Sequence, residues 1–243
     1  MNRIVDTISP QREDTLVEIG PGLGAMTRPL LRRCGGLTAI ELDADLIPGL
    51  RESCRAFGEL RLVECDALLV DYREFAQDGP IRLVGNLPYN VSTPLIFHLL
   101  GQTPCILDMH FMLQREVVER MCAAPGGSDY GRLSVMVQYL CATEALFEVG
   151  PDAFRPRPKV RSTLVRLVPF TTLPHPARDF ESLRTIVRAA FGKRRKTLRN
   201  ALDGVLSAKQ IEEAGVDPSG RAQTLNVEAF VNLADARARS GEV

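Results

Sequence analysis

Short apolar runs alternate with longer amphipathic stretches along the first half of the chain. Four of the apolar runs have the length and composition of buried strands, at residues 15–19, 37–40, 60–63 and 81–84. Between the early runs, residues 25–33 and 45–57 carry apolar side chains at helical spacing. Strands and helices in alternation are typical of a parallel sheet with crossover helices. The first half therefore predicts an α/β fold.

The second half continues this pattern and then becomes helical. Residues 106–113 and 163–168 have strand patterns, residues 115–123 and 132–140 have helical ones, and the proline-rich, basic stretch 150–160 predicts an extended loop. Further helices are expected at residues 179–191, 196–206, 208–214 and 227–237. We therefore expect a boundary near residue 173, with a mainly parallel α/β domain over residues 1–172 and a small helical domain over residues 173–243.

Composition places the chain among ordinary globular proteins, with 45% hydrophobic and 25% charged residues in a total of 243. No run approaches the roughly 18 apolar residues that span a bilayer. Residues 1–6 lack the basic and then apolar segments of a secretory signal. The six cysteines are scattered and the chain has three histidines, which argues against a disulfide framework or a zinc site. We expect reduced thiols, a cytoplasmic location, no metal and no membrane contact.

Charge is unevenly distributed although the net charge is zero. Residues 1–150 carry 13 basic against 20 acidic side chains, whereas residues 151–243 carry 17 against 10. Seven basic residues and no acidic one lie between Arg184 and Arg199. Basic side chains often do no more than keep helices soluble, but this density favours contact between the second half and a polyanion.

Three glycines, Gly20, Gly22 and Gly24, follow the first expected strand and precede the first expected helix. Glycine lets the backbone turn sharply and approach a ligand closely. Glu41 ends the next strand, where a carboxylate can accept hydrogen bonds from both hydroxyls of a ribose. Asp66 follows the third strand and can reach an adenine. Together these residues predict a nucleotide-like cofactor site at the carboxyl edge of the sheet.

The glycine-rich turn is compatible with more than one cofactor. Gly20 and Gly22 with Ala25 also satisfy the dinucleotide fingerprint, so an NAD or FAD enzyme is an alternative, as is a purely structural turn. Glu18 favours S-adenosylmethionine, because a carboxylate near the turn suits a sulfonium and an amino group better than a pyrophosphate. An oxidoreductase would also need a catalytic histidine, a tyrosine–lysine pair or a substrate arginine, and none stands in a suitable context.

The segment Asn86-Leu87-Pro88-Tyr89 directly follows the fourth strand. It is good turn chemistry, but beside Gly20, Glu41 and Asp66 it predicts a site for a flat, amino-bearing base. The Asn86 side-chain oxygen and the Leu87 carbonyl can accept hydrogen bonds from an exocyclic amine, Pro88 stiffens the backbone and Tyr89 can stack on the ring. The combination predicts methyl transfer to the N6 amine of an adenine, driven by alignment rather than by a strong base. The base must leave its stack to enter such a pocket.

Over these motifs the chain closely resembles the bacterial small-subunit (16S) rRNA adenine N6,N6-dimethyltransferases of the KsgA type. The shared stretches run in family order along nearly the whole chain: residues 18–24 (EIGPGLG), 40–43 (IELD), 65–67 (CDA), 85–94 (GNLPYNVSTP), 108–117 (DMHFMLQREV), 130–135 (YGRLSV), 154–160 (FRPRPKV) and 194–200 (RRKTLRN).

The resemblance implies a Rossmann-like class I S-adenosylmethionine methyltransferase domain followed by a small helical domain. It implies cofactor contacts at Gly20, Gly22, Glu41, Leu42, Asp66, Ala67 and Asn86, and a target amine surrounded by Asn86, Leu87, Pro88 and Tyr89, with Phe154 as a second aromatic near the base. Family members dimethylate two adjacent adenosines in a hairpin near the 3′ end of small-subunit rRNA, late in ribosome assembly, and release S-adenosylhomocysteine. We expect a monomer that binds the small ribosomal subunit.

The RNA-binding candidates are the basic residues near the start of the helical domain. They are Arg188, Lys193, Arg194, Arg195, Lys196 and Arg199. One departure concerns the N-terminus, because family members usually begin with a basic arm and a Gln-Asn-Phe-Leu-like segment, whereas residues 1–5 here already have the pattern of the first helix. We expect this chain to hold its cofactor more weakly, and to turn over more slowly, than a version carrying that arm.

Two other functions fit the same residues. A related group methylates large-subunit rRNA and confers macrolide resistance with the same fold and base motif, although residues 108–117 and 130–135 favour the small-subunit group. A non-catalytic assembly factor would use only the basic segment and its phosphate contacts. Substitution of Asn86 separates catalysis from binding. His98 is expected to be a packing or capping residue, and Met109, Phe111 and Met112 are expected to be strand core.

Overall fold

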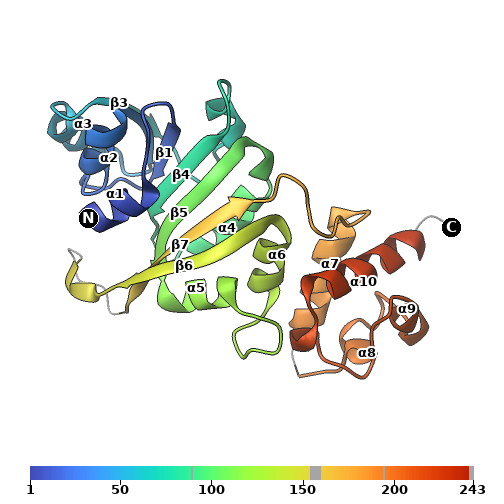
Figure 1. The fold of residues 1–243 in the computed structure, drawn as a ribbon. Coiled ribbons are helices and arrows are strands. Elements are labelled where there is room, and N and C mark those ends of the chain that lie inside the picture. The colour runs from blue at the N-terminus through green and yellow to red at the C-terminus, as the bar shows by residue number, and fades with distance from the viewer. Residues whose placement is uncertain (89, 154–159, 194, 241–243) are drawn as a thin grey trace. The chain divides into compact units, whose positions relative to one another are not determined.

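The computed structural model describes residues 1–88, 90–153, 160–193 and 195–240. Its centre is a seven-stranded sheet with the order β3-β2-β1-β4-β5-β7-β6 (Figure 1). The strands are β1 (Thr15–Ile19), β2 (Gly36–Glu41), β3 (Glu59–Glu64), β4 (Ile81–Asn86), β5 (Ile106–Gln114), β6 (Cys141–Val149) and β7 (Ser162–Pro169). Strands β1 to β5 pair in parallel and β7 runs antiparallel to β5. The predicted α/β architecture with a mainly parallel sheet is confirmed.

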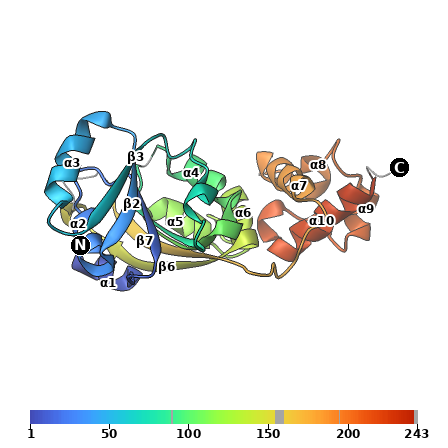
Figure 2. The same ribbon diagram turned by 90° about the horizontal axis from the view of Figure 1, so that it is seen from above.

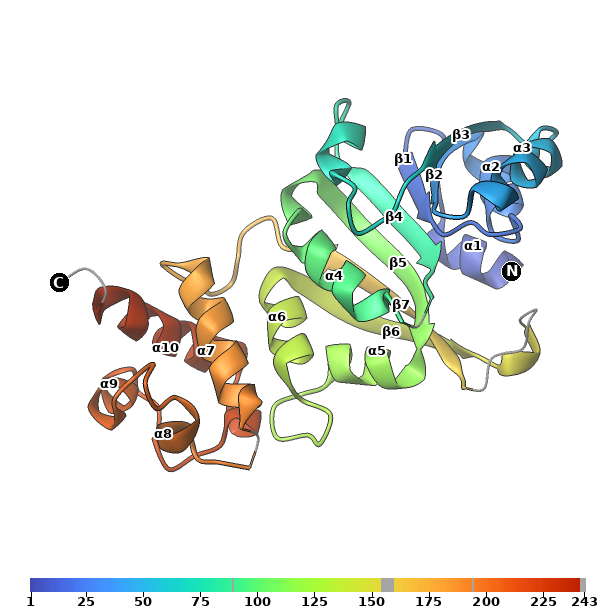
Figure 3. The ribbon, with the colours of Figure 1, turned by 180° about the vertical axis from the view of Figure 1, so that it is seen from behind.

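The helices connect and cover these strands. They are α1 (Asn2–Ile8), α2 (Thr27–Cys34), α3 (Ile47–Cys54), α4 (Ser92–Leu100), α5 (Arg115–Cys122), α6 (Arg132–Leu140), α7 (Phe180–Gly192), α8 (Leu198–Ala201), α9 (Ala208–Glu213) and α10 (Val227–Ser240). Buried residues of α1, α2 and α3 form one apolar cluster with Leu16 and Ala39 of the sheet. Helix α4 lies on the opposite face from α1, behind the sheet in Figure 1 and in front of it in Figure 3.

The strand order creates a switch point between β1 and β4. The chain builds β1, β2 and β3 outward in one direction and then returns to place β4 on the other side of β1. Strand β1 is buried from Leu16 to Ile19 and β4 from Ile81 to Gly85, as expected for parallel strands covered on both faces. Open α/β sheets bind ligands at the carboxyl ends of the strands beside such a switch point. The fold therefore positions a site where β1 and β4 end.

The chain divides into two compact units. One comprises Met1–Val118 with Glu144–Pro169, and the other comprises Glu119–Thr143 with Phe170–Val243. Inside the second unit, α7 and α10 lie side by side (Figure 2), the Tyr139 ring stacks on Phe180 at 5.9 Å, and Tyr130 meets Phe191 edge-on at 6.2 Å. The division between Pro169 and Phe170 thus lies near the expected boundary at residue 173. Helix α6 belongs to the same unit as the C-terminal helices. The division of functions between residues 1–172 and 173–243 stays a prediction.

Helix α4 was not among the expected helices, and two further elements differ from the sequence-based prediction. Strand β6 was not predicted, because α6 passes into it at Cys141 without a turn residue that marks a boundary. The helix expected at residues 196–206 is wrong, since α8 covers only Leu198–Ala201. Its first two backbone N–H groups donate to the carbonyls of Gly220 and Pro218, and Gly204 adopts a left-handed φ of 78° that excludes helix. Tertiary contacts therefore override the local pattern there.

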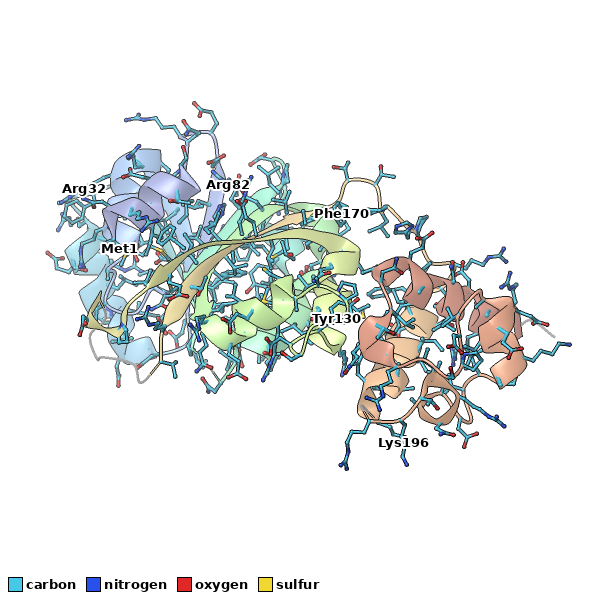
Figure 4. The ribbon with its side chains drawn as sticks, turned by 60° about the horizontal axis from the view of Figure 1, so that its bottom comes forward. Met1, Arg32, Arg82, Tyr130, Phe170 and Lys196 are labelled. Atoms are coloured by element: carbon cyan, nitrogen blue, oxygen red, sulfur yellow. The ribbon has the colours of Figure 1, made fainter. Side chains whose placement is uncertain are left out.

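A buried arginine fastens α1 to the sheet at the end remote from the switch point. Arg82 of β4 donates two hydrogen bonds to Asp108 of β5 at 2.9 Å and one to Asp14 at 2.7 Å. It also donates to the backbone carbonyls of Ile8 and Ser9, where α1 ends. Figure 4 labels this side chain within the strand-bearing part of the chain. Arg82 thus joins three segments through a single guanidinium.

All six cysteines are free thiols. Within residues 1–88, 90–153, 160–193 and 195–240, no helix has the length and apolar character to cross a membrane. As expected, Met109, Phe111 and Met112 are buried strand residues. His98 also packs as expected, with its Nε2 lying 2.8 Å from the carbonyl oxygen of Val70.

Candidate functional site

The strand register brings the predicted site residues to one edge. Ile19 of β1 pairs with Ile40 on one side and with Gly85 on the other. The residues that follow, Gly20, Glu41 and Asn86, therefore stand at the same level on three adjacent strands. Glu41 in turn pairs with Glu64 of β3, two residues before Asp66. The cofactor residues and the base motif thus converge at the switch point, although they are scattered over the sequence.

The glycine-rich turn is open on its outer side. Gly20, Gly22 and Gly24 have φ values of 68°, 56° and 76°, which L side chains rarely adopt. A Cβ at Gly20 or Gly22 would have no atom within 4 Å, so free space lies over the turn. The turn itself is held from beneath, since the Gly20 N–H donates to the Ile40 carbonyl at 3.0 Å. The backbone is shaped to let a ligand approach closely.

Glu41 is buried and its carboxylate is held by two backbone groups. The Gly22 N–H donates to Oε2 at 3.0 Å, and the Asp43 N–H donates to Oε1 at 3.0 Å. Each carboxylate oxygen can accept more than one hydrogen bond, so both keep capacity for ribose hydroxyls. The adjacent Leu42 is 67% exposed, which leaves an apolar side chain at the rim of the site. Glu41 therefore links the glycine-rich turn to the loop after β2.

Asp66 begins the loop after β3 in a fixed orientation. Its Oδ1 accepts a hydrogen bond from the Leu68 N–H at 2.9 Å, and its backbone carbonyl accepts one from the Leu69 N–H. The carbonyl of the next residue, Ala67, accepts a hydrogen bond from the Tyr72 hydroxyl at 3.1 Å. Asp66 and Ala67 are both half-buried. The second carboxylate oxygen of Asp66 can thus meet an amine at a defined position.

The base motif combines an exposed polar side chain with a buried anchor. Asn86 is exposed at the end of β4, whereas the Leu87 side chain is 1% exposed and its N–H donates to the Met112 carbonyl. Pro88 is exposed, and its carbonyl accepts a hydrogen bond from the Val91 N–H. Tyr89 and Phe154, both predicted at the base, lie outside the described residues.

Gly85 is a residue of this site that sequence reasoning missed. A Cβ there would lie 2.6 Å from the Ile19 carbonyl oxygen and 3.0 Å from a methyl group of Leu87. Strands β1 and β4 can therefore approach this closely only because residue 85 is glycine. A glycine inside a strand pattern is the signal that could have found it, since it often marks such a backbone approach.

Glu18 lies beneath the turn and carries a perturbed carboxyl group. It is 1% exposed, and its Oε2 has no hydrogen-bond partner among the described residues. Burial raises the pKa of Glu18 to about 7. The nearby Thr27 hydroxyl lowers the Glu18 pKa somewhat, although the two groups do not form a hydrogen bond of normal geometry. The negative charge of the Glu41 carboxylate raises the pKa further. Small changes in pH near neutrality therefore shift the Glu18 carboxyl group between its protonated and ionised forms.

The Glu18→Gln variant is expected to be more stable than the parent protein in alkaline solution. The folded state keeps the Glu18 proton between pH 4.5 and about 7, whereas the unfolded chain has lost it, so this stabilisation is complete below pH 4.5 and disappears as pH rises through about 7. We expect the variant to gain about 2–3 kcal/mol in unfolding free energy at about pH 8.5, and nothing at pH 4.5. Urea unfolding of the ligand-free proteins across this range measures the difference. Parallel stability curves would contradict a raised pKa.

The predicted RNA-binding side chains gather around the end of α7. Arg188, Lys193, Arg195, Lys196 and Arg199 are all exposed, and Lys196 points away from the helices in Figure 4. Arg184 is also exposed but forms an ion pair with Glu181 at 2.7 Å. Arg194 lies outside the described residues. We refer to Arg188, Lys193, Arg195, Lys196 and Arg199 as the α7 basic surface.

In the part of the chain that the structure describes, no group of three or more histidine, cysteine, aspartate or glutamate side chains could hold a metal ion. The donors at the carboxyl edge are instead separate carboxylates, a side-chain amide and backbone groups. This set suits the hydroxyls and amines of a nucleoside.

The sequence matches the family model described as "Ribosomal RNA adenine dimethylase" over residues 1–238. A "Ribosomal RNA small subunit methyltransferase A" from Marinobacter nauticus is 51% identical over 243 residues, covering 100% of this chain and 88% of its own length. A protein with the same description from Pseudomonas fluorescens is 55% identical over 236 residues, covering 97% of this chain and 87% of its own.

Two solved structures resemble the fold along nearly the whole chain. A dimethyladenosine transferase from Plasmodium falciparum has a TM-score of 0.81 and 25% sequence identity, covering 96% of this chain and 92% of its own. The 23S rRNA methyltransferase ErmE has a TM-score of 0.73 and 25% identity, covering 97% and 96%.

Proposed function

The chain belongs to the ribosomal RNA adenine dimethylase family, and we propose that it methylates small-subunit (16S) rRNA. The enzyme is an S-adenosylmethionine-dependent rRNA adenine dimethyltransferase with the Rossmann-like class I methyltransferase fold. Its substrate is the N6 amine of two adjacent adenosines in a hairpin near the 3′ end of the rRNA. The observation that carries the proposal is the register of β1, β2 and β4, which sets Gly20, Glu41 and Asn86 side by side.

The residues present fit S-adenosylmethionine. The open space over Gly20 and Gly22 would accommodate the amino acid portion, and the Glu41 carboxylate would accept hydrogen bonds from the ribose hydroxyls. Asp66, whose Oδ1 is held by Leu68, would accept a hydrogen bond from the adenine amine through its other oxygen, and the exposed Leu42 would offer the ring an apolar contact. When bound, S-adenosylmethionine supplies a methyl group on a positively charged sulfur and becomes S-adenosylhomocysteine as the methyl is transferred.

The base motif orients the target amine. The Asn86 side-chain oxygen and the Leu87 carbonyl accept its two hydrogens, which localises the nitrogen lone pair and directs it toward the cofactor site. Leu87 can hold this position because its side chain is buried and its N–H is fixed on Met112. Pro88 limits the backbone of the turn. Tyr89 and Phe154, which lie outside the described residues, are the aromatic residues that we propose would stack on the base. The residues act by alignment, so no strong general base is required.

The relatives support the small subunit as the target. The two curated relatives that are 51% and 55% identical are both described as small-subunit methyltransferases, whereas ErmE, described as a 23S rRNA methyltransferase, is 25% identical. We place the reaction late in assembly of the subunit and in the cytoplasm, and we propose that the protein acts as a monomer without a metal. The part beyond residue 173 would bind the RNA.

Methyl transfer from labelled S-adenosylmethionine to small ribosomal subunits that lack the modification tests the proposal. We expect N6,N6-dimethyladenosine in the rRNA, identified by nucleoside mass spectrometry, and none on large subunits. Product on large subunits alone would assign the protein to the 23S-modifying group. Binding to small subunits without product would instead identify a non-catalytic assembly factor.

Charge reversal on the α7 basic surface is expected to weaken subunit binding and its salt dependence. The Arg195→Glu/Lys196→Glu variant should reduce the slope of log affinity against log salt by about 2, because each lost phosphate contact lowers it by about 1. Arg51→Glu/Arg55→Glu changes the net charge equally at exposed residues near the end of α3 and serves as the control. Equal slopes for the two variants would exclude this surface from RNA binding.

A further inference from the structure

Tyr72 is the centre of a buried hydrogen-bond network behind the loop that carries Asp66 and Ala67. The Tyr72 side chain is fully buried, and its hydroxyl donates to the Ala67 carbonyl at 3.1 Å. Its backbone N–H donates to the Gln102 side-chain oxygen at 2.7 Å. Tyr72 therefore connects the start of the loop with a side chain that follows α4.

His98 of α4 fastens the middle of the same loop. Its Nε2 lies 2.8 Å from the Val70 carbonyl oxygen, which also accepts from the Gln102 amide at 3.3 Å. The same Nε2 also lies 3.0 Å from the Gln102 amide nitrogen. The His98 ring also meets the Tyr72 ring edge-on, at a centroid distance of 5.9 Å. The middle and the end of the loop are thus tied to the α4 segment, and its start is tied to the Tyr72 hydroxyl.

The anchored carbonyl groups of Ala67 and Val70 control which face of the loop is turned toward a ligand. The Tyr72 hydroxyl fixes the Ala67 carbonyl, so the peptide between Ala67 and Leu68 has a set orientation. Asp66 precedes it, with one carboxylate oxygen held by Leu68. Burial raises the pKa of Tyr72, so the hydroxyl remains a donor over the whole working range of pH.

We infer that Tyr72, with His98 and Gln102, positions Asp66 and Ala67 for recognition of the cofactor's adenine, and so sets the preference for an amino purine. The inference rests on the proposed cofactor site. Tyr72 is a positioning residue, since its hydroxyl points to Ala67 and not to the ligand. Because α4 follows the base motif along the chain, the same network joins the cofactor loop to the segment that begins after Asn86.

The Tyr72→Phe variant tests this role with the loss of one oxygen atom. The probes are S-adenosylhomocysteine and S-inosylhomocysteine, in which a carbonyl oxygen replaces the adenine amine, and calorimetry measures the affinity of each. The parent protein should prefer the adenine compound. In the variant, the affinity for the adenine compound should fall about fivefold, the loss expected for one net hydrogen bond, and the affinity for the inosine compound should change less. The preference between the two probes therefore decreases.

Tyr139→Phe is the matched control. It also removes a buried tyrosine hydroxyl, one that accepts a hydrogen bond from the Ala177 N–H in the second unit, and both affinities should remain unchanged. Gln102→Ala should reproduce the reduced preference, because Tyr72 N–H then loses its acceptor. A Tyr72→Phe protein that is less stable but keeps the parent's preference would overturn the inference and reduce Tyr72 to a structural residue. Failure of the parent protein to bind either probe would refute the cofactor site itself.

Discussion

Replacement of Asn86 by alanine is expected to lower the rate of methyl transfer by about a hundredfold to a thousandfold, the usual effect of removing one preorganised polar group from a reacting centre. Asn86 is exposed at the end of β4, next to the position where β1 turns at Gly20. Of the three motif residues that the structure describes, Asn86 is the one with a polar side chain, and it stands at the level of Gly20 and Glu41. Without its oxygen, the amine keeps a single acceptor at Leu87 and its lone pair is poorly aligned.

Single-turnover methylation of small subunits, with both substrates saturating, measures this loss apart from binding. The affinity for the subunit, measured by sedimentation, should stay within about twofold of the parent, because phosphate contacts dominate it. Asn232→Ala removes an exposed asparagine from α10 and should change neither quantity. A variant at Asn86 that methylates at the parental rate would remove this residue from the reaction.

The part of the fold that sequence could predict is the part with the strongest local pattern. Strand β1 occupies Thr15–Ile19 as predicted, because a short, mostly apolar run followed by glycines leaves few other structures. Strand β6 could not be predicted in the same way, since its residues are mostly exposed or half-buried and no turn residue separates it from α6. Helix α8 begins at Leu198, where the first N–H groups donate to the distant carbonyls of Gly220 and Pro218, and the left-handed backbone of Gly204 excludes helix further on. Local pattern carries no information about such partners.

The same distinction between local pattern and tertiary contact applies to the residues of the candidate site. Gly20, Glu41 and Asn86 could be chosen from sequence because each follows a predicted strand, and parallel strands end at one edge. Tyr72 could not, since its role depends on hydrogen bonds to Ala67 and Gln102. Gly85 left only an indirect signal, a glycine inside a strand pattern, and its 2.6 Å approach to Ile19 is known only from the fold. Residues that would touch a ligand are recognised by their chemistry, whereas the contacts of the residues that hold them in place are known only from the fold.

The Arg82→Met variant is expected to lose about 3–5 kcal/mol in unfolding free energy, because it removes the cation that is hydrogen-bonded to the buried Asp108 and the half-buried Asp14. Arg166 remains 3.8 Å from Asp108 and is itself 43% exposed. Arg82 is 8% exposed and Asp108 is 4% exposed, so Asp108 cannot recover its hydrogen bonds from water. The carbonyls of Ile8 and Ser9 also lose their donors, and Ser9 ends α1 in a left-handed conformation with φ of 47°. Loosening of α1 should therefore accompany the loss of stability.

Arg73 provides a control that separates the effect of burial from the effect of the ion pair itself. Its guanidinium makes the same two-pronged contact, with both nitrogen–oxygen distances to Asp71 at 2.8 Å, but its side chain is 74% exposed. Arg73→Met should therefore change the urea midpoint little, since water replaces the lost partner. Hydrogen exchange would test the second expectation, with protection lost first in α1 of Arg82→Met and unchanged there in Arg73→Met. Equal midpoints for the two variants would mean that the Arg82 network contributes no more than an exposed ion pair, despite its burial and its five hydrogen bonds.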